Sequence, residues 1–364
     1  METIAEDKQP LSKRKIKAIR NDPEKTAAAM DLVYVNDNQP GIQRIKSGKG
    51  FAYKLNGKKI NNQAVLERIR SLVIPPAWEN VWICALDNGH LQATGLDVKN
   101  RKQYKYHPHW NALRNHTKYY RLLDFGNALP AIRAQLQKDI SLPGMPVEKV
   151  LALVVILMEQ TNIRIGNNFY EKLYGSFGLT TLKDKHVAIN GSKLKFIFRG
   201  KKGVEHDISL KNKKLSALVK KCRDIPGKEL FQYYDDDGTR RPIDSGMVNN
   251  YIKKISGTDF SAKDFRTWSG TLQAFKALKD LGPFETDTEK KKKIVEALDI
   301  VAGQLGNTRT VCKKYYVHPA IISLYENNAF AKLGDKLPEN TNNDEIKTEV
   351  MPEELVVLKI LKTQ

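Results

Sequence analysis

The apolar periodicity of the chain changes near Asn111, and this change constrains the fold more than any other feature of the sequence. Before it, short runs with strand-like alternation are separated by turn residues such as Asn56-Gly57 and Asn88-Gly89. After it, apolar residues recur at helical spacing, as in residues 147–160, 168–174 and 267–281. The pattern predicts an α+β chain with a small, mostly β N-terminal domain and a larger, mainly helical domain.

One β island interrupts the helical part of the chain. Residues 186–189, 193–198 and 204–210 read as strands, and tight turns at Asn190-Gly191 and at residues 200–203 separate them. The sequence therefore predicts a three-stranded meander inside the larger domain.

The length of 364 residues favours roughly two domains, and we expect four segments. These are a flexible basic tail (1–30), the β-rich domain (31–110), the helical domain (111–330) and a polar C-terminal tail (331–364). We expect the C-terminal tail to be loosely packed and to end in a short amphipathic helix. The longest apolar run, residues 150–158, is too short for a membrane helix, which needs ~20 residues. Because the N-terminus also lacks the apolar centre of a secretory signal, we expect a soluble intracellular protein with no membrane partner.

The charge balance points to a polyanionic partner. Lys and Arg number 61 against 41 Asp and Glu, which gives a net charge of +20. Nucleic acid is the leading candidate, since neutralised phosphates release counterions and supply non-specific affinity. The alternative is a basic surface with no partner.

Metal and nucleotide chemistry find little support in the sequence. Three widely spaced cysteines predict neither a disulfide framework nor a Cys-based zinc site. The acidic run at residues 235–237 precedes Gly238, so a solvated turn is favoured over a magnesium site. Because the sequence has no GxxxxGK[ST] loop, we expect a reaction without ATP. We also expect no cofactor and no metal.

Four basic or aromatic clusters are candidates for chemistry. Arg164 directly follows the most apolar helix, where a cation is costly unless an anion reaches it; the alternative is a helix C-terminal arginine interacting with the macrodipole. Lys201 occupies the tip of the meander, which is either a mobile amine or a solvated turn. Residues 263–268 place cations and aromatic residues at a helix start, either to hold a phosphate or as an ordinary amphipathic opening.

The densest cluster spans residues 305–319. Thr308 is a candidate cap for a short helix that carries two lysines followed by Tyr315 and Tyr316. Neighbouring positive charge favours the phenolate form of a tyrosine, which is its nucleophilic form. The alternative is one core tyrosine and one surface tyrosine.

Taken in order along the chain, these residues give Arg, Lys, Lys-x-x-Arg, Asn and Tyr. This ordered set resembles the type IB DNA topoisomerases of the poxviral and bacterial branch, over roughly residues 30–330. The resemblance implies a DNA-binding β domain, a catalytic helical domain and relaxation of supercoiled duplex DNA through a 3′-phosphotyrosyl intermediate. It also implies an isomerase that needs neither ATP nor an obligatory metal.

The resemblance carries over to individual residues of the catalytic domain. Tyr316 matches the nucleophile, although Tyr315 stands where the family usually has a small residue. Arg164 and Arg266 match the arginines that hold the non-bridging oxygens of the phosphate. Lys201, which is next to Lys202, matches the general acid, and Lys263 matches the accessory cation. Asn307 stands where poxviral enzymes commonly have histidine, and it can donate a hydrogen bond but cannot titrate near neutrality. The full catalytic set is Tyr316, Arg164, Lys201, Arg266 and Asn307, with Lys263 as the accessory cation.

In the N-terminal domain, residues 101–106 resemble the strand that the family places in the DNA major groove. Gln103 is expected to read an adenine edge, while Tyr104 and Tyr106 contact bases or backbone. The basic residues of this segment are expected to contact phosphates; they are Lys99, Arg101, Lys102 and Lys105.

Two other classes remain as alternatives. A tyrosine recombinase has the same chemistry, but the domain order and the Lys-x-x-Arg motif argue against it. An architectural DNA-binding protein explains the charge but leaves the ordered residues as coincidence. We expect a monomer that acts on double-stranded DNA, in the cytoplasm and associated with the nucleoid.

Overall fold

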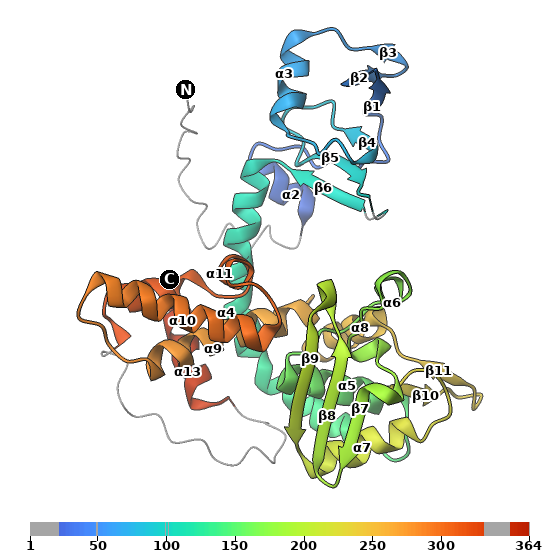
Figure 1. Ribbon diagram of the computed structural model, residues 1–364, viewed down its shortest axis with the longest axis vertical. Helices are drawn as coiled ribbons and strands as arrows, with labels where there is room; N and C mark the ends of the chain where they lie inside the picture. Colours follow the sequence, from blue (N-terminus) through green and yellow to red (C-terminus); the bar gives the residue numbers. More distant parts are fainter. Residues whose placement is uncertain (1–21, 49, 99, 101, 331–349, 364) are drawn as a thin grey trace. The chain divides into compact units, whose positions relative to one another are not determined.

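The computed structural model describes residues 22–363, except residues 49, 99, 101 and 331–349. The chain divides into two compact units, Met1–Tyr120 and Arg121–Gln364. The helix α4 (Pro108–Ile140) runs continuously through the division (Figure 1). The expected boundary near residue 110 therefore falls inside a helix, since nothing in the residues around it stops helical hydrogen bonding.

The first unit contains a six-stranded antiparallel sheet with the strand order β3-β2-β1-β4-β5-β6. A small core forms where Ile69 of the helix α3 packs against Ile42, Val81 and Ile83 of the sheet. Asn62 caps α3 by accepting a hydrogen bond from the backbone N–H of Val65. The elements of the unit are β1 (Ile42–Ser47), β2 (Gly50–Leu55), β3 (Lys58–Lys59), α3 (Gln63–Ser71), β4 (Glu79–Ile83), β5 (Leu91–Leu96) and β6 (Lys102–Tyr106).

The end of the expected N-terminal tail is a helix, α2 (Pro23–Ala28). The side chain of Asp22 caps it, accepting from the N–H groups of the first turn. Ala27 is fully buried and packs with Leu32 and Trp110, so burial stabilises a turn that has little apolar periodicity of its own. The remaining part of the expected tail, residues 1–21, lies outside the described residues.

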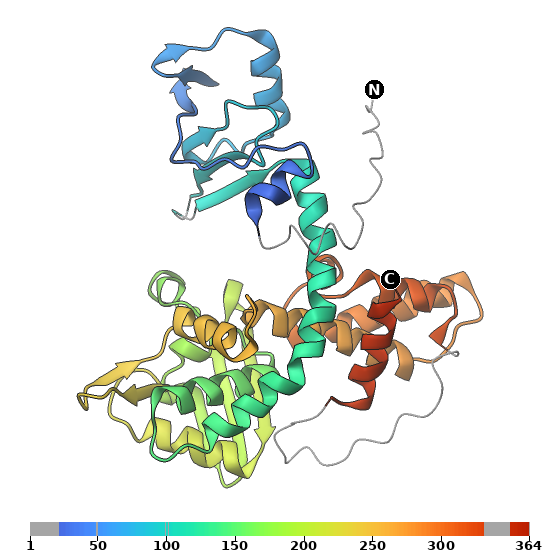
Figure 2. The same cartoon turned by 180° about the vertical axis from the view of Figure 1, so that it is seen from behind.

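The core of the second unit is built around the helix α5 (Val147–Thr161). Its central run from Val150 to Met158 is buried on every side, as expected for a helix that is apolar all round. The meander β7 (Val187–Asn190), β8 (Lys193–Arg199) and β9 (Glu205–Lys211) is antiparallel, which confirms the predicted sheet. The helix α5 lies behind these strands in Figure 1 and in front of them in Figure 2.

The remaining elements of the second unit are helices, short 3₁₀ turns and one small hairpin. Within the described residues, none of the helices is both long and apolar enough to span a membrane. These elements are α6 (Asn168–Tyr174), η1 (Leu179–Thr181), η2 (Asp184–His186), η3 (Lys201–Gly203), α7 (Lys213–Arg223), β10 (Gln232–Tyr234), β11 (Arg240–Pro242), α8 (Ser245–Ser256), α9 (Ala262–Asp280), α10 (Asp287–Leu305), α11 (Arg309–Tyr315), α12 (Pro319–Glu326) and α13 (Pro352–Lys362).

The end of the expected C-terminal tail, α13, belongs to the core of the second unit. Glu354 is buried and accepts hydrogen bonds from both Nη atoms of Arg133 (2.8 and 2.9 Å) and from Nε1 of Trp268 (3.1 Å). Val357 and Leu358 join the apolar core beside these contacts. The structure confirms the short helix expected at the end of the tail. The expectation of loose packing is wrong for it, because its partners are more than 80 residues away along the chain.

Candidate active site

Arg164 lies in the segment after α5, where the backbone is tightly fixed. The helix ends at Asn162, whose left-handed φ of 56° turns the chain out of the helical path. The carbonyl of Arg164 accepts a hydrogen bond from the N–H of Leu179 (2.9 Å). A Cβ on Gly178 would lie 2.5 Å from that carbonyl oxygen, so the close approach requires glycine. The backbone from which the Arg164 guanidinium extends is therefore rigid.

Arg266 lies on α9 and is held by the ends of two other helices. Its Nη1 donates to the carbonyl of Asn162 at the end of α5, and its Nη2 donates to the carbonyl of Leu305 at the end of α10 (2.7 Å). Helix C-termini carry partial negative charge, which stabilises a cation there. The Arg266 side chain is buried, and among the described residues its Nε has no hydrogen-bond partner.

Asn307 follows Gly306, which ends α10 with a φ of 57°. Its Oδ1 accepts a hydrogen bond from Nη2 of Arg164 (2.6 Å), and the Gly306 carbonyl accepts from the same atom (3.0 Å). The Nδ2 of Asn307 is buried and, within the part of the chain that the structure describes, has no partner. The Oδ1 atom of Asn307 thus orients Arg164, while the Nδ2 donor remains available for a ligand.

Tyr316 is the tyrosine that the structure places beside these groups. Its ring centroid lies 5.4 Å from Cζ of Arg266, whereas Tyr315 is 40% exposed. The Tyr316 carbonyl accepts a hydrogen bond from Oγ1 of Thr271 (3.1 Å). A Cβ on Gly270 would lie 2.8 Å from that carbonyl, so α9 approaches the end of α11 closely. Thr308 caps α11, as the sequence predicts.

The two arginines concentrate positive charge without a carboxylate. Burial lowers the pKa of Arg164 to about 10, and repulsion from Arg266 contributes to the shift. Burial also lowers the pKa of Arg266, and the nearby hydroxyl of Tyr316 partly opposes this. Among the described residues, neither guanidinium forms an ion pair with a carboxylate; the arginines that do so lie elsewhere. Cations that are partly or fully buried without a counter-ion are costly, so this arrangement is suited to receive an anion.

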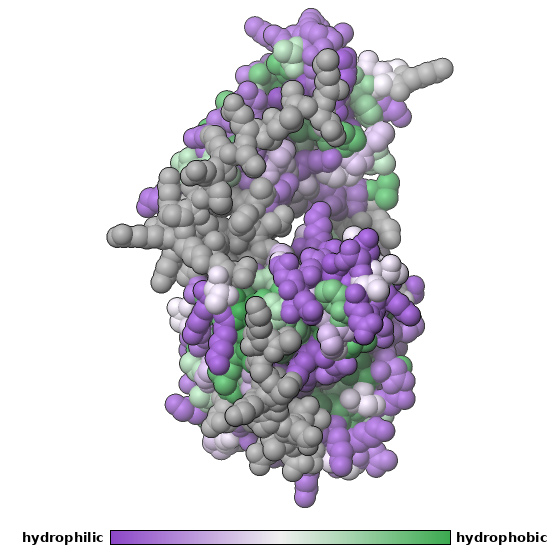
Figure 3. Space-filling view, turned by 90° about the vertical axis from the view of Figure 1, so that its left-hand side faces the viewer, coloured by the Kyte–Doolittle hydropathy of each residue, from purple (hydrophilic) through white to green (hydrophobic). Residues whose placement is uncertain are grey.

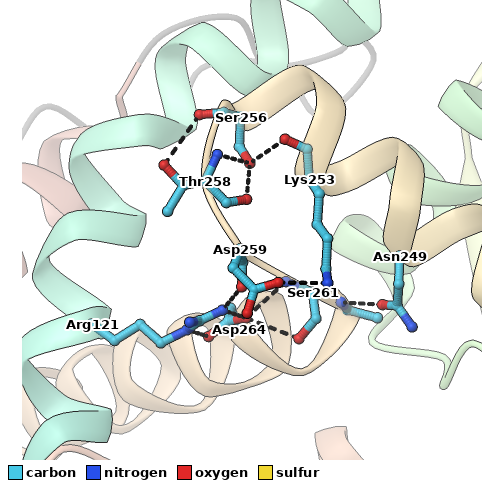
Figure 4. Close-up of polar contacts among 9 residues, drawn as sticks. Arg121, Asn249, Lys253, Ser256, Thr258, Asp259, Ser261 and Asp264 are labelled. Carbon is cyan, nitrogen blue, oxygen red and sulfur yellow. Dashed lines mark hydrogen bonds and ion pairs between the residues drawn. The ribbon is translucent and has the colours of Figure 1, made fainter. Parts of the chain in front are cut away.

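A polar network fixes the start of α9, four residues before Arg266 (Figure 4). The carboxylate of Asp264 accepts from the backbone N–H and Oγ of Ser261 (2.8 and 2.9 Å), and Arg121 binds both of its oxygens (2.8 and 3.1 Å). Oδ1 of Asn249 accepts from the N–H of Ala262 (3.0 Å). These contacts hold the first turn of α9, which presents the exposed side chain of Lys263.

Lys201 lies in the turn that joins β8 to β9. The turn closes through a hydrogen bond from the N–H of Gly200 to the carbonyl of Val204 (2.7 Å). Lys202 and Gly203 take left-handed φ values of 63° and 78°, which confirms the predicted tight turn. Both lysines are exposed at this tip.

The predicted DNA-contacting strand is β6 of the first unit. Tyr104 is 48% exposed and stacks on Tyr106 with a centroid distance of 6.0 Å. Nε2 of Gln103 donates to Asp97 (2.9 Å), and Lys102 pairs with Asp37 (2.5 Å). Two side chains expected to contact DNA are therefore bound to carboxylates of the same unit. Two further expected contacts, Lys99 and Arg101, lie outside the described residues.

The acidic run at residues 235–237 forms a turn between β10 and β11. The side chain of Asp235 accepts from the backbone N–H of Thr239 (2.8 Å) and pairs with Arg241. This confirms the turn that the sequence favours.

Sequence reasoning missed His206, which the structure places beside Arg164 and Arg266. The signal for it was available, because His206, Ile208 and Leu210 are the inward positions of the alternating strand β9. It also missed Thr271 and Gly270, and their contact with Tyr316 has no pattern in the sequence.

Taken together, a buried and a half-buried arginine, an amide donor and a phenol define the class of site: one that binds an oxyanion beside a nucleophilic oxygen. Enzymes that transfer phosphoryl groups have sites of this class.

Comparison with known proteins identifies the family. The sequence model for the catalytic core of eukaryotic DNA topoisomerase I matches residues 104–340, and the model for the N-terminal domain of bacterial DNA topoisomerase IB matches residues 50–97. DNA topoisomerase 1B of Acanthamoeba polyphaga mimivirus is 33% identical over 297 residues, which cover 79% of this chain and 88% of the relative. DNA topoisomerase 1B of Vaccinia virus (strain Copenhagen) is 25% identical over 265 residues, which cover 71% and 79%. The chain belongs to the type IB DNA topoisomerase family.

Proposed function

We propose that this chain relaxes supercoiled duplex DNA by cutting and resealing one strand through a 3′-phosphotyrosyl intermediate. The observation that carries the proposal is the pair Arg164 and Arg266 beside the phenol of Tyr316. Among the described residues the pair has no carboxylate counter-ion, so a phosphodiester supplies the missing negative charge.

In the reaction, Oη of Tyr316 attacks the phosphorus, and the bond from phosphorus to the 5′ oxygen breaks. The phenolic proton passes to solvent, and Lys201 supplies a proton to the departing 5′ oxygen. General acid catalysis of this kind contributes typically ~10²–10⁴-fold. One phosphodiester replaces another, so the 5′ hydroxyl reverses the reaction after strand rotation and ATP is not required.

The transition state gathers charge on the non-bridging oxygens of the phosphate. Arg164 and Arg266 are positioned to stabilise that charge, and Nδ2 of Asn307 supplies a neutral donor. A single well-placed donor of this kind is worth about 3–4 kcal/mol in catalysis. The role of Asn307 needs no proton transfer, so an amide serves where a histidine stands in other members of the family.

We assign the duplex contacts outside the scissile phosphate to β6 and to Lys263. Tyr104 and Tyr106 contact DNA bases or backbone. When DNA binds, Lys102 leaves Asp37 and Gln103 leaves Asp97, and both side chains contact the DNA instead. Lys99 and Arg101 complete the phosphate contacts. The first unit is thus the DNA-binding domain and the second the catalytic domain.

A single chain carries the whole proposed set, namely the DNA-contacting strand, the arginine pair and the nucleophile. We therefore propose that the protein acts as a monomer. Its net charge of +20 favours association with DNA, and we propose that it acts in the cytoplasm, associated with the nucleoid.

The test is relaxation of plasmid DNA by the wild type, by Tyr316→Phe and by Tyr315→Phe, in EDTA and without ATP. We expect the wild type and Tyr315→Phe to relax negative and positive supercoils, and Tyr316→Phe to relax neither while still binding DNA. The two tyrosines are adjacent, so each variant is a matched control for the other.

Three results would contradict the proposal. Loss of relaxation in Tyr315→Phe alone would move the nucleophile by one residue. Loss in EDTA with recovery on adding magnesium would overturn the metal-free mechanism. DNA binding without any relaxation by the wild type would leave an architectural protein.

A further inference from the structure

His206 lies between two glycines that precede proposed catalytic residues. A Cβ on Gly200, the residue before Lys201, would lie 2.6 Å from both Cδ2 and Nε2 of the imidazole. A Cβ on Gly306, the residue before Asn307, would lie 2.6 Å from Cε1. Side chains do not approach this closely, so one imidazole fills the space that both glycines leave open.

The strands of the meander fix the orientation of the imidazole. His206 is directly opposite Phe198 in the register of β8 and β9, and the rings stack at 4.9 Å with an interplanar angle of 22°. Phe198 is itself buried in the core of the unit. The imidazole is therefore braced by the core on one side and meets the Gly306 turn at its Cε1 edge.

The charges around His206 favour a neutral ring. Burial lowers the pKa of His206, and the positive charges of Arg164 and Arg266 lower it further, while Glu205 acts weakly in the opposite direction. A neutral imidazole can pack against the arginine site without adding a third positive charge.

We infer that His206 is a positioning residue that holds the Lys201 hairpin against the Asn307 turn, so that the lysine reaches the phosphate that the amide contacts. This inference rests on the proposed roles of those two residues. The contact between His206 and Gly306 joins β9 to the turn that ends α10, and these elements are far apart in the sequence. Misplacement of a catalytic group by about 1 Å can cost ~10²-fold in rate, so a packing contact of this kind has a measurable effect.

The experiment is single-turnover cleavage of a duplex by the wild type, His206→Ala, Gly200→Ala and the double variant. Each is measured with the natural 5′ oxygen and with a 5′-bridging sulfur at the scissile bond. A thiol ionises near pH 8.5, so a sulfur leaving group departs without the proton that an oxygen needs. Rates on the sulfur substrate are therefore insensitive to the position of Lys201.

We expect His206→Ala to cleave the oxygen substrate about 10- to 100-fold more slowly than the wild type and the sulfur substrate within about threefold of it. Gly200→Ala should show the same selective loss, because its Cβ displaces the imidazole and its φ of −96° creates no backbone strain. Since both changes act on one contact, the double variant should be no slower than the slower single variant.

The control is Asp207→Ala, which removes an exposed ion pair with Lys195 on the same strand and should leave both rates unchanged. Equal slowing of His206→Ala on both substrates, or multiplicative losses in the double variant, would overturn the positioning role. An unchanged rate on the oxygen substrate in both single variants would also overturn the role. Gly200→Ala tests the contact even if His206→Ala does not fold. Failure of the proposed function is a different outcome, because the wild type would then cleave neither substrate.

Discussion

The guanidinium of Arg266 is fixed by carbonyl groups rather than by carboxylates. Its two bonded carbonyls end α5 and α10, so the side chain is oriented without losing its net positive charge. A carboxylate at the same place would neutralise it and compete with a phosphate. Orientation by helix termini therefore suits a residue that must bind an anion.

Asn307 provides the sharpest test at the scale of a residue. Asn307→Asp keeps the shape and the oxygen that accepts from Arg164, but it replaces the donor Nδ2 with a negatively charged oxygen. We expect single-turnover cleavage to slow by at least ~10²-fold, since a transition-state donor is lost. Asn190→Asp, at the exposed end of β7 in the meander, is the matched control and should leave the rate unchanged. Wild-type cleavage by Asn307→Asp would remove Asn307 from the transition state.

At the scale of elements, α13 is the part of the unit that local sequence describes least well. Arg133 lies between two carboxylates, those of Glu159 and Glu354. Nε1 of Trp268 donates to Glu354, and this connects α13 with α9 two residues beyond Arg266. The C-terminal helix thus supports the helix that carries a proposed catalytic arginine.

Glu354→Gln tests this support. The change removes one of the two carboxylates that pair with the buried Arg133, which keeps Glu159, and we expect the free energy of unfolding to fall by about 2 kcal/mol. The control is Glu353→Gln, whose ion pair with Lys276 spans 3.8 Å and should contribute less than about 1 kcal/mol. Denaturant titration of both variants measures the difference, and equal small losses would show that α13 does not depend on this contact.

The same contact sets an acid dependence of stability. Burial alone raises the pKa of Glu354, but the hydrogen bond and charge of Arg133 outweigh burial and hold it below its ordinary value of 4.5. A carboxyl with a lowered native pKa stabilises the fold above its unfolded pKa and loses that contribution as the pH falls through the native value. The stability difference between the wild type and Glu354→Gln should therefore be constant above about pH 5 and shrink on acidification. A difference that grows on acidification would contradict the sign of the shift.

Elements with strong local signals were predictable from the sequence. The predicted helix at residues 168–174 has the same bounds as α6, because Asn167 caps it and Gly175 ends it in a left-handed conformation. The three strands of the meander follow their alternation and turns in the same way. By contrast, the docking of α13 depends on Arg133, which is 221 residues from Glu354. No local pattern encodes such a contact.

The candidate site likewise combines residues with a local sequence signal and residues whose role depends on distant contacts. Arg164 and Arg266 stand out in the sequence as cations next to apolar helices, and the structure brings them together beside Tyr316. His206 was missed because its importance comes from Gly306, which lies 100 residues further along the chain. The alternation of β9 places His206 on the inward face, but nothing in spacing or periodicity shows that its ring fills the space between two distant backbone turns.

At the scale of the whole molecule, charge is the dominant property. Outside the residues drawn in grey, the face in Figure 3 is mostly hydrophilic, with hydrophobic residues in smaller patches. A net charge of +20 keeps such a chain dispersed and attracts a polyanion over long range. Affinity for DNA should therefore depend strongly on ionic strength.

We expect the logarithm of the DNA-binding constant to fall linearly with the logarithm of salt concentration. Lys263→Gln should make this slope shallower by about 0.9, because it removes one phosphate contact. Tyr104→Phe, which removes no charge, should weaken binding without changing the slope. Fluorescence anisotropy at several salt concentrations measures both, and an unchanged slope in Lys263→Gln would place that lysine away from the DNA.

The most direct measurement of the central claim is the chemistry of the covalent adduct. A duplex labelled at the 5′ or at the 3′ end of the cleaved strand is incubated with the wild type or Tyr316→Phe, denatured and separated on a gel. We predict that only the 5′ label travels with the wild-type protein, because the enzyme holds the 3′ phosphate, and that Tyr316→Phe retains no label. Transfer of the 3′ label instead, or an adduct that survives in Tyr316→Phe, would contradict the account.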